Sequence, residues 1–232
     1  MADRAALPKY LQIAEFLVRE ITAGRLRVGD RLPPERQMAD GMGIAVGTLR
    51  KALARLERQG ILERRQGSGN YILDTDQGGS IYAFFRLERL DGGGLPRARV
   101  LSVTRLPKPA DLPDFGGSDT AHRIRRLRYL DDRAVAAEEI WLDGEITDRL
   151  DAQALSESLY LYYRETLGLW ITAIEDRIGV DAMPGWGQDT GCDEGAVCGH
   201  VLRQSRTSDG ALPEVSRTWF NHDRARYVAR NS

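Results

Sequence analysis

The sequence predicts an α+β protein built from two successive domains, and three observations support this prediction. A chain of 232 residues is long for one domain and comfortable for two. Apolar residues recur at helical spacing in the first third, whereas strand-like alternation prevails beyond about residue 80. The later segments form successive hairpins with few helices, which is typical of an antiparallel sheet. We expect domains at residues 1–74 and 80–232, joined by a linker at 75–79.

Three helices are expected in the N-terminal domain. The first spans residues 10–23, where apolar side chains recur on one side and Gly24 can end the helix. Two consecutive prolines fix the entry to a short second helix at 35–40. The third helix spans residues 45–59. Its apolar stripe follows the spacing of one buried helix face: Leu49, Ala52, Leu53 and Leu56.

The second and third helices, separated by a glycine-containing turn at 41–43, have the pattern of a helix-turn-helix. The free side of the third helix carries basic residues, as expected for a helix that enters the major groove of DNA. A hairpin should follow, with strands at 61–65 and 70–73 joined by a turn at 66–69. Such a hairpin is a wing, so the sequence predicts a winged helix-turn-helix that binds DNA.

Seven residues of this domain are candidates for DNA contacts. Arg50 can pair with a guanine through two hydrogen bonds, and Thr48 can bind a phosphate or touch a thymine methyl group. The others would neutralise phosphates or allow the wing backbone to approach closely: Arg36, Lys51, Arg65, Gly67 and Gly69. The alternative is a small packed helical domain whose arginines are merely solvated.

The charge distribution supports the same division. Residues 1–75 hold 13 Lys and Arg against 9 Asp and Glu, whereas the rest of the chain holds 20 against 25. A basic head on an acidic body suits a DNA-binding domain attached to a domain that does not bind DNA. No apolar run approaches the roughly 20 residues that cross a bilayer, and the first residues lack the apolar core of a secretion signal. We therefore expect a cytoplasmic protein without a membrane partner.

The second domain is expected to form an antiparallel sheet with two helices. Strands are expected at residues 80–87, 99–106, 121–129, 134–142, 170–180, 197–205 and 214–220. Helices are expected at 148–155 and 159–167, the second closed by Gly168. A glycine-rich stretch at 185–195 should be a long loop, and the sequence suggests no function for it.

Two sets of polar residues in this domain are candidates for a binding site. Arg126 and Arg128 alternate on one expected strand and so share a face, and Glu138 on the partner strand can face them. The second set lies on the last long strand: Glu214 and Ser216 on one face, with Trp219 just beyond. Paired arginines suit a phosphate, sulfate or carboxylate ligand. The alternative is a solvent-facing strand with ordinary charge pairs.

The sequence implies no metal, cofactor or catalytic residue. Cys192 and Cys198 are separated by five residues, and no second pair of Cys or His lies at zinc-site spacing. Two reduced structural thiols are therefore expected. The three histidines are scattered and form no recognisable pair with a nucleophile.

These residues together resemble the GntR family of bacterial transcription regulators. The head matches through Leu32-Pro33-x-Glu35-Arg36, Gly43-Ile44, Thr48-Leu49-Arg50 and Arg65-x-Gly67-x-Gly69. The second domain is similar to the UTRA effector domain of the HutC-type subfamily. The supporting motifs are Arg126-Leu127-Arg128, Glu138-Glu139-x-x-Leu142, Ser158-Leu159-Tyr160 and Gly210-x-x-x-Glu214-x-Ser216.

The resemblance implies a homodimer whose two winged heads bind double-stranded operator DNA with near-palindromic half-sites. It also implies a chorismate-lyase-like fold for the second domain, which would bind a small anionic metabolite and control operator affinity. By motif, Arg36, Thr48, Arg50 and Gly69 match DNA-contact positions. Arg126, Arg128, Glu138, Glu214 and Trp219 match effector-pocket positions.

We expect a ligand-responsive repressor of a catabolic or transport operon. The alternatives are a constitutive DNA-binding protein with a non-functional pocket and an enzyme related to chorismate lyase.

The chain departs from the family pattern at the starts of two helices. Ala45-Val46 stand where the family commonly has Ser-Arg, and Pro34 stands where a serine is usual. Each change removes a capping hydroxyl, whose loss typically costs about 1 kcal/mol. Loss of the arginine also removes a contact to base or phosphate. We therefore expect operator recognition to depend more on Arg50, Thr48 and the wing.

Overall fold

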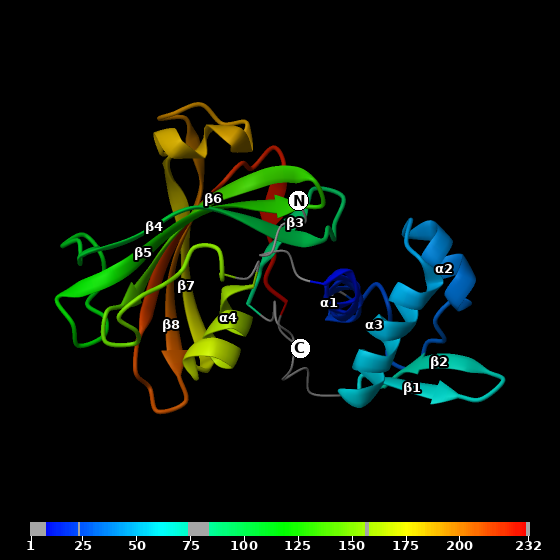
Figure 1. Ribbon diagram of the computed structural model, residues 1–232. Coiled ribbons are helices and arrows are strands. Elements are labelled where there is room, and N and C mark those ends of the chain that lie inside the picture. The colour runs from blue at the N-terminus through cyan, green and yellow to red at the C-terminus, as the bar shows by residue number, and fades with distance from the viewer. Residues whose placement is uncertain (1–7, 23, 74–83, 156–157, 231–232) are drawn as a thin grey trace. The chain divides into compact units, whose positions relative to one another are not determined.

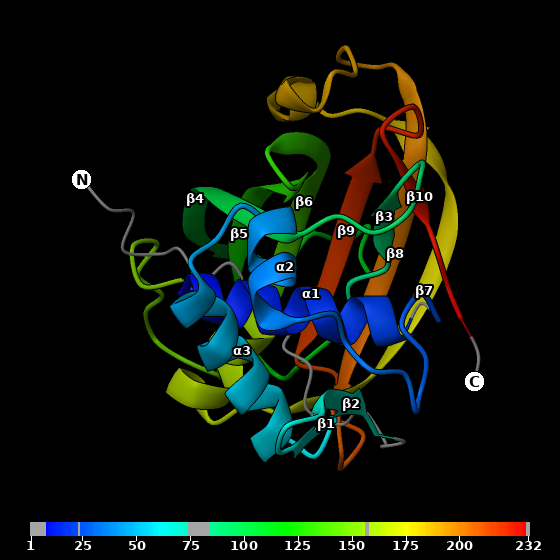
Figure 2. The same cartoon turned by 90° about the vertical axis from the view of Figure 1, so that its right-hand side faces the viewer.

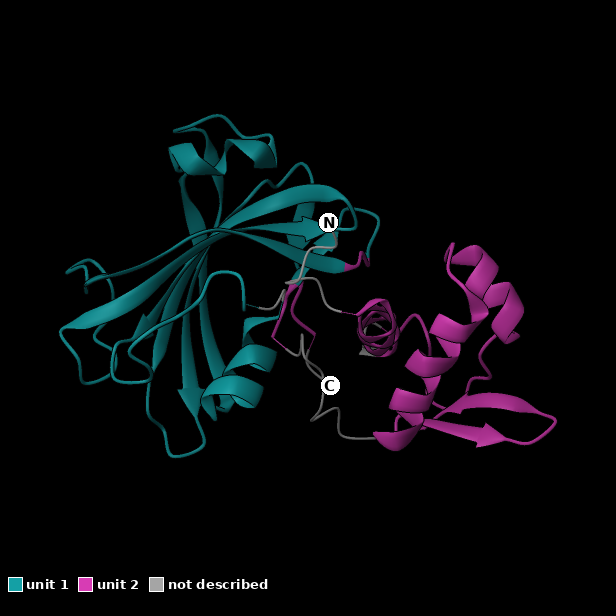
Figure 3. Ribbon diagram, viewed as in Figure 1, with its two compact units in different colours: residues 1–6, 87–92, 96–227 teal, residues 7–86, 93–95, 228–232 magenta. Residues whose placement is uncertain are grey.

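The computed structural model describes residues 8–22, 24–73, 84–155 and 158–230 (Figure 1). The chain divides into two compact units: a helical unit made mainly of residues 7–86 and a sheet unit made mainly of residues 87–227 (Figure 3). Each unit is described by itself. The linker expected at 75–79 lies outside the described residues, as do residues 80–83 of the strand expected at 80–87.

Among its described residues, the helical unit contains three helices and one hairpin, close to their expected positions. Figure 1 shows their arrangement. The elements are α1 (Lys9–Thr22), α2 (Glu35–Gly41), α3 (Val46–Arg58), β1 (Leu62–Arg65) and β2 (Gly69–Ile72). All five contribute to one apolar core, in which Leu17 of α1, Leu49 and Leu56 of α3 and Ile72 of β2 are almost completely buried. This shared core fixes the helix-turn-helix against the wing, since isolated short helices and hairpins are unstable in water.

Helix α3 begins without a side-chain cap. Its N-cap residue is Ala45, with φ −68° and ψ 140°, and no side chain bonds the first free N–H groups of the helix. The backbone already has the extended conformation that capping serines adopt. The four stripe residues expected from the sequence are all buried on α3: Leu49, Ala52, Leu53 and Leu56.

Ala45→Ser is therefore expected to raise the free energy of unfolding of the helical unit by about 1 kcal/mol, because the hydroxyl can accept a free N–H of the first turn. Urea unfolding followed by far-ultraviolet circular dichroism measures the change. Ala54→Ser, at an exposed position inside the same helix, is the matched control. It should lower stability slightly, since serine is a poorer helix former than alanine. Equal effects at the two positions would contradict the capping argument.

The sheet unit is built on a six-stranded antiparallel sheet, as the sequence predicts. Its spatial order is β4-β5-β6-β9-β8-β7. The strands are β4 (Pro96–Pro107), β5 (Thr120–Leu130), β6 (Arg133–Asp143), β7 (Ile171–Ala182), β8 (Val197–Thr207) and β9 (Glu214–Phe220). Asp131 adopts φ 56° in the tight turn that joins β5 to β6, between the strands expected at 121–129 and 134–142.

A second, two-stranded sheet pairs β3 (Leu87–Arg89) with β10 (Ala225–Tyr227), and Figure 2 shows the two strands side by side. The sequence prediction did not include β10. The strand expected at 80–87 is wrong in its described part, because residues 84–86 are not in a strand and pairing begins only at Leu87. Short strands carry little periodic signal, so the pairing of the two ends of the unit is visible only in the fold.

Three short helical segments complete the sheet unit. They are α4 (Leu159–Tyr162), the π-helix η1 (Tyr163–Leu167) and the 3₁₀-helix η2 (Gly185–Thr190). The helix expected at 159–167 is thus present, and Gly168 ends it with φ 66°. Ser158 caps α4 by accepting the N–H of Leu161 at 3.4 Å. The loop expected at 185–195 contains η2, which packs over β6.

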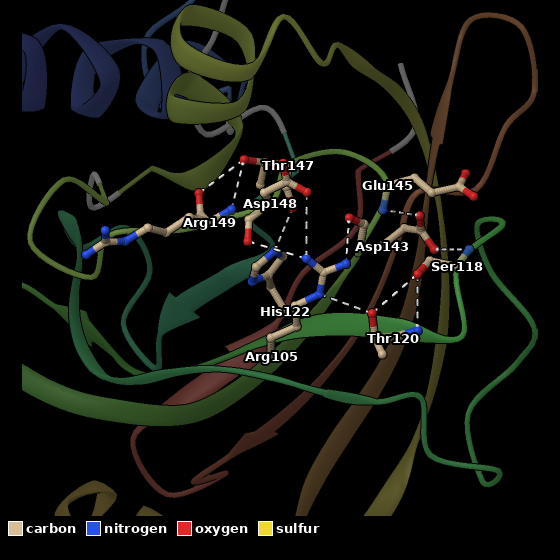
Figure 4. Close-up of polar contacts among 10 residues, drawn as sticks. Arg105, Ser118, Thr120, His122, Asp143, Glu145, Thr147, Asp148 and Arg149 are labelled. Carbon is tan, nitrogen blue, oxygen red and sulfur yellow. Dashed lines mark hydrogen bonds and ion pairs between the residues drawn. The ribbon is translucent and has the colours of Figure 1, made fainter.

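Residues 148–155 form turns, so the helix expected there is wrong. Thr147 Oγ1 accepts the N–H of Arg149 at 3.4 Å (Figure 4). Asp151 Oδ1 accepts the N–H of Gln153 at 2.9 Å. Short polar side chains that bind nearby backbone compete with helical hydrogen bonds. These local bonds replace the helix that the apolar spacing indicated.

Side chains of the sheet fix the segment that leads into these turns (Figure 4). The His122 ring nitrogen Nε2 lies 2.8 Å from the carbonyl oxygen of Thr147. Arg105 donates to the carbonyl oxygen of Asp148 at 3.4 Å. These bonds tie the connection between β6 and α4 to β4 and β5.

Candidate functional site

Arg50 of α3, the candidate for a base contact, lies at the surface of the helical unit. The Arg50 side chain is 63% exposed, and its Nε donates to Glu35 Oε2 at 2.6 Å. Arg64 of the wing lies 3.7 Å from the other oxygen of Glu35. Glu35, which opens α2, therefore holds one arginine of α3 and one of the wing at the same edge of the unit. An exposed pair of this kind orients side chains more than it stabilises the fold.

The remaining candidates for DNA contacts on the helices are at least partly exposed and lie apart from the ion pairs of Glu35. Arg36 and Lys51 are exposed and Thr48 is half-buried. Each lies on α2 or α3, and none takes part in the Glu35 cluster. Such positions suit contacts to successive phosphates along a groove.

The wing meets the start of α2 at a hollow of about 370 Å³, whose lining includes Gly67 and Gly69. Gly67 and Gly69 adopt φ 73° and 117°, which side-chain-bearing residues rarely adopt. Arg65, also in the lining, bonds Glu63 at 2.9 Å and lies 4.4 Å from the centre of the Tyr71 ring. The turn expected at 66–69 is confirmed as the tip of the wing.

Arg31 is a further basic residue at this hollow that the sequence analysis missed. A Cβ on Gly69 would lie 3.0 Å from Arg31 Nε, so the glycine leaves room for this guanidinium. Arg31 pairs with Tyr71 through an isolated β-bridge, which adds it to the wing. In the sequence, Arg31 stands two residues before the Pro33-Pro34 pair that opens the second helix. This position is the feature that could have identified it.

The sheet unit buries the first candidate set. Arg126 stands directly opposite Glu138 in the register of β5 and β6, and the two side chains form a close ion pair. Arg128 Nε lies 4.0 Å from the same carboxylate. Arg126 is 6% exposed and Arg128 2%. The alternative of a solvent-facing strand is therefore wrong.

Glu214 and Ser216 share the sheet face of this pair, which we call the arginine face. By register, Ser216 of β9 stands opposite Arg203 of β8, and Glu214 stands opposite Ser205. Ser205 Oγ donates to Glu214 Oε1 at 2.8 Å, and Tyr160 of α4 donates to the same oxygen at 3.2 Å. The fold thus brings five of the six candidates of this unit onto one covered face.

The arginine face also holds residues that the sequence analysis missed. Arg203 forms two hydrogen bonds of 2.7 Å with Asp176 of β7. Tyr227 of β10 donates to Asp176 at 2.5 Å, so this side chain reaches the arginine face from β10. Arg203 is an even number of residues from Ser205, but only the pairing of β8 with β9 shows that both face Arg126.

Burial and charge shift the titration of this cluster in opposite directions. Burial raises the pKa of Glu138, whereas the positive charges of Arg126 and Arg128 lower it. The effect of the arginines is larger, so the pKa falls below 4.5. Burial raises the pKa of Glu214 above 4.5. Burial and the nearby Glu214 also raise the pKa values of Tyr160 and Tyr163. Burial and charge therefore move the pKa values of Glu138 and Glu214 in opposite directions on the same face.

Glu214→Gln is expected to melt at a higher temperature than the parent at pH 8. A carboxyl whose pKa is raised by folding stabilises the fold below its unfolded pKa and loses that contribution as the pH rises through the folded pKa. The advantage of the amide should therefore appear between about pH 4 and pH 8. Thermal unfolding followed by tryptophan fluorescence measures it.

Glu138→Gln is the matched control, because the pKa of Glu138 is lowered. Its carboxylate stabilises the fold above the unfolded pKa, so this variant should be less stable than the parent at pH 8 and approach it in acid. The melting temperatures of Glu214→Gln and the parent could also differ by the same amount at about pH 4 and pH 8. In that case Glu214 would not be a buried carboxyl with a raised pKa.

Trp219 lies on the opposite face of the sheet, so the structure does not join it to the other candidates. It stands opposite Ala137 and His200 in the strand register, an odd number of residues from Ser216. Its indole Nε1 donates to Asp181 Oδ2 at 3.0 Å, and its ring packs edge-on against Trp186 at 6.0 Å. Strand alternation makes Trp219 part of the core beneath η2.

Both cysteines are free thiols, in accord with the sequence prediction. Cys198 is buried in the core beneath η2, and burial raises its pKa to about 11. Within the described ranges, no group of three or more His, Cys, Asp or Glu could hold a metal ion. No helix in those ranges is long and apolar enough to span a bilayer.

Two family models match the chain. The model of bacterial regulatory proteins of the gntR family matches residues 9–72, and the model of the UTRA domain matches residues 91–226. The first match spans the helix-turn-helix and the wing. The second spans the six-stranded sheet and the arginine face.

Individual proteins resemble the chain over most of its length. The HTH-type transcriptional regulator SmoD of Agrobacterium fabrum is 57% identical over 226 residues, 97% of each chain. The mannosyl-D-glycerate transport/metabolism system repressor MngR of Escherichia coli is 29% identical over 226 residues, 93% of this chain and 92% of its own.

A ligand-binding domain of the GntR family from Bordetella bronchiseptica shares the fold of the sheet unit. It has a TM-score of 0.57 at 24% identity and covers 65% of this chain and 99% of its own. Sequence, family models and fold agree. The chain therefore belongs to the gntR family of bacterial transcriptional regulators, as a HutC-type member that joins a DNA-binding helix-turn-helix to a UTRA domain.

Proposed function

We propose that this regulator is a ligand-responsive repressor, which binds a near-palindromic operator as a homodimer and is controlled by a small anion on the arginine face. The observation that carries the proposal is the burial of Arg126 and Arg128 around a single carboxylate, Glu138. Burying charged groups is costly unless they are paired or serve a ligand.

For DNA, the exposed arginines of the helical unit supply the chemistry. Arg50 would read a base edge in the major groove, with Thr48 beside it on the first turns of α3. Arg36, Lys51 and Arg65 would neutralise phosphates, and Gly67 and Gly69 would let the wing backbone approach DNA. Arg31 and Arg64 join this set because they line the same hollow.

For the effector, the arginine face favours an anion with hydroxyl groups. Three guanidinium groups, those of Arg126, Arg128 and Arg203, face the carboxylates of Glu138 and Asp176 and the carboxyl of Glu214, whose pKa is raised by burial. Arginine forks match phosphate and carboxylate oxygens. The hydroxyls of Tyr160 and Ser216 can bond sugar-like hydroxyl groups.

Control of DNA binding requires that the ligand prefer one of two states of the dimer. A ligand that binds the DNA-free state more tightly lowers operator affinity by the same factor by which operator DNA lowers ligand affinity. The repressor assignment is supported by MngR, whose name describes a repressor of a transport and metabolism system.

The proposal is tested by polarisation titration of the protein against its own upstream DNA. We expect saturable binding that weakens as salt rises, and release of the DNA by one class of anion among phosphate, sugar phosphates and organic acids. Absence of saturable binding to any upstream fragment would exclude the repressor.

Thermal shift separates a regulator from a constitutive DNA-binding protein with a non-functional pocket. The regulator gains stability with the same anion that releases DNA, because a ligand that binds only the folded state stabilises it. Operator binding without any stabilising anion would favour the constitutive protein.

A further inference from the structure

The two edges of the six-stranded sheet differ in how well they are protected. Edge strand β4 begins and ends with proline and has a bulge between Val100 and Ser102. Three of its arginines form ion pairs with neighbouring aspartates: Arg97, Arg99 and Arg105. Prolines, bulges and charges are the features that keep an edge from pairing with another chain.

Edge strand β7 contains no proline, although it carries charged residues and one bulge. Among the described residues, only β8 pairs with it, and Figure 2 shows it along the outer margin of the sheet. Its single bulge lies at the start, between Ile171 and Ala173. Beyond that point it runs regularly to Ala182, without proline. A long regular edge leaves a row of backbone N–H and C=O groups available for another strand.

The outer half of β7 also exposes aliphatic side chains. Ile178 is 57% exposed and Val180 74%, and both lie on the arginine face. Val197 of β8, opposite Ala182 on the same face, is 66% exposed. Isolated exposed aliphatic residues are ordinary, but a contiguous set beside an unpaired edge marks an interaction surface.

The sequence of β7 is complementary to itself when the two-fold axis of a strand pair passes through Gly179. In a two-fold antiparallel pair, opposed residues point to the same side of the sheet, so the axis must pass through a residue. An axis at Glu175, Asp176 or Arg177 places that charge opposite its own copy. An axis at Ile178 places Glu175 opposite Asp181. Each of these registers opposes like charges.

An axis at Gly179 removes this conflict. It places Ile178 opposite Val180 and Arg177 opposite Asp181, twice each, and keeps residues 176–182 paired. The aliphatic pair covers the side chains that are exposed in one copy, and the charge pair is of opposite sign. Gly179 at the axis has nothing within 4 Å of a built Cβ, so the strands can approach there.

We propose that β7 is the dimer contact of the sheet unit and pairs with β7 of a second copy around Gly179, forming one continuous twelve-stranded sheet. This inference rests on the proposed function, which requires a homodimer, and adds the surface and the register. It also places Asp176, which holds Arg203, within the paired segment. The arginine face would then be linked to the dimer contact through one strand.

Gly179→Cys in the full-length protein tests the register. Opposed Cα atoms in an antiparallel pair are about 4.5–5.5 Å apart, within the range of a disulfide. Mild oxidation with copper phenanthroline should therefore convert most of this variant into a covalent dimer on a non-reducing gel. Glu175→Cys, also exposed on β7, is the matched control. Its two copies would lie about 26 Å apart and should not cross-link.

The parent protein controls for its own two cysteines, and sedimentation equilibrium gives the mass before oxidation. A dimer that cross-links at Gly179 and not at Glu175 supports the proposal. A dimer that does not cross-link at Gly179 overturns the β7 contact and leaves the proposed homodimer intact. A monomer at concentrations that saturate operator DNA overturns both.

Val180→Lys tests the aliphatic contact without a new bond. It should raise the dimer dissociation constant at least about tenfold, because a charge would face Ile178 at the centre of the contact. Leu101→Lys, at an exposed aliphatic position (41%) on the opposite edge, should leave the constant unchanged. Equal constants for the two variants would also overturn the contact.

Discussion

Arg50→Ala is expected to abolish specific operator binding while the fold and the dimer persist. Its exposed side chain is held through Nε by Glu35, which leaves the terminal nitrogens for a guanine edge. One such contact discriminates by about 1–3 kcal/mol, so two half-sites give a loss of about 30-fold to 10⁴-fold. Polarisation titration against operator and scrambled duplexes of equal length, at one salt concentration, measures the loss.

Lys51→Ala is the matched control on the same helix. As a proposed phosphate contact, it should weaken binding to both duplexes alike and reduce the dependence of affinity on salt. Arg50→Ala should affect the operator far more than the scrambled duplex. If Arg50→Ala kept the parent's operator affinity, another side of α3 would face the groove.

Glu138→Leu is expected to destabilise the sheet unit by about 3–5 kcal/mol, because it leaves two buried guanidinium groups without their carboxylate. Glu138 bonds Arg126 and lies 4.0 Å from Arg128. All four tryptophans of the chain lie between residues 141 and 219, so tryptophan fluorescence during urea unfolding reports on the sheet unit alone. The helical unit, which unfolds separately in principle, does not contribute.

The stability lost in Glu138→Leu is expected to depend on pH. The pKa of Glu138 is lowered below 4.5 by its arginine partners, so its contribution is present above that pH and is lost as the pH falls through the folded pKa. The deficit of the variant should therefore shrink in acid. Glu175→Leu breaks an ion pair with Arg177 in which both side chains are about half exposed or more. It should change stability little, and an equal deficit in both variants would contradict the burial argument.

Much of the fold could be predicted from the sequence, since the periodicity of single elements is a local property. The stripe of α3, the glycine-tipped wing and six long strands appear where apolar spacing and turn residues place them. The helix expected at 148–155 failed for a local reason as well. Thr147 and Asp151 bind nearby backbone N–H groups, and apolar spacing does not register that competition.

The part of the candidate site that could be predicted consists of residues that alternate along a single strand. Arg126 and Arg128 share a face because they are two residues apart, and Glu214 and Ser216 share one for the same reason. Trp219 was assigned to the site by proximity in sequence, although an odd spacing puts it on the other face. Arg203 and Asp176 could not be included, because nothing local shows which strands become neighbours.

The sequence by itself determined the winged helix-turn-helix, the α+β class of the second domain and the residue types available at each site. Only the tertiary structure decided that the arginines are buried, that Arg203 and Tyr160 join them, and that Trp219 does not. The physical reason is that helix and strand periodicity depends on neighbours within a few residues. Strand order, register and the cover over each face depend on contacts between residues far apart in the chain.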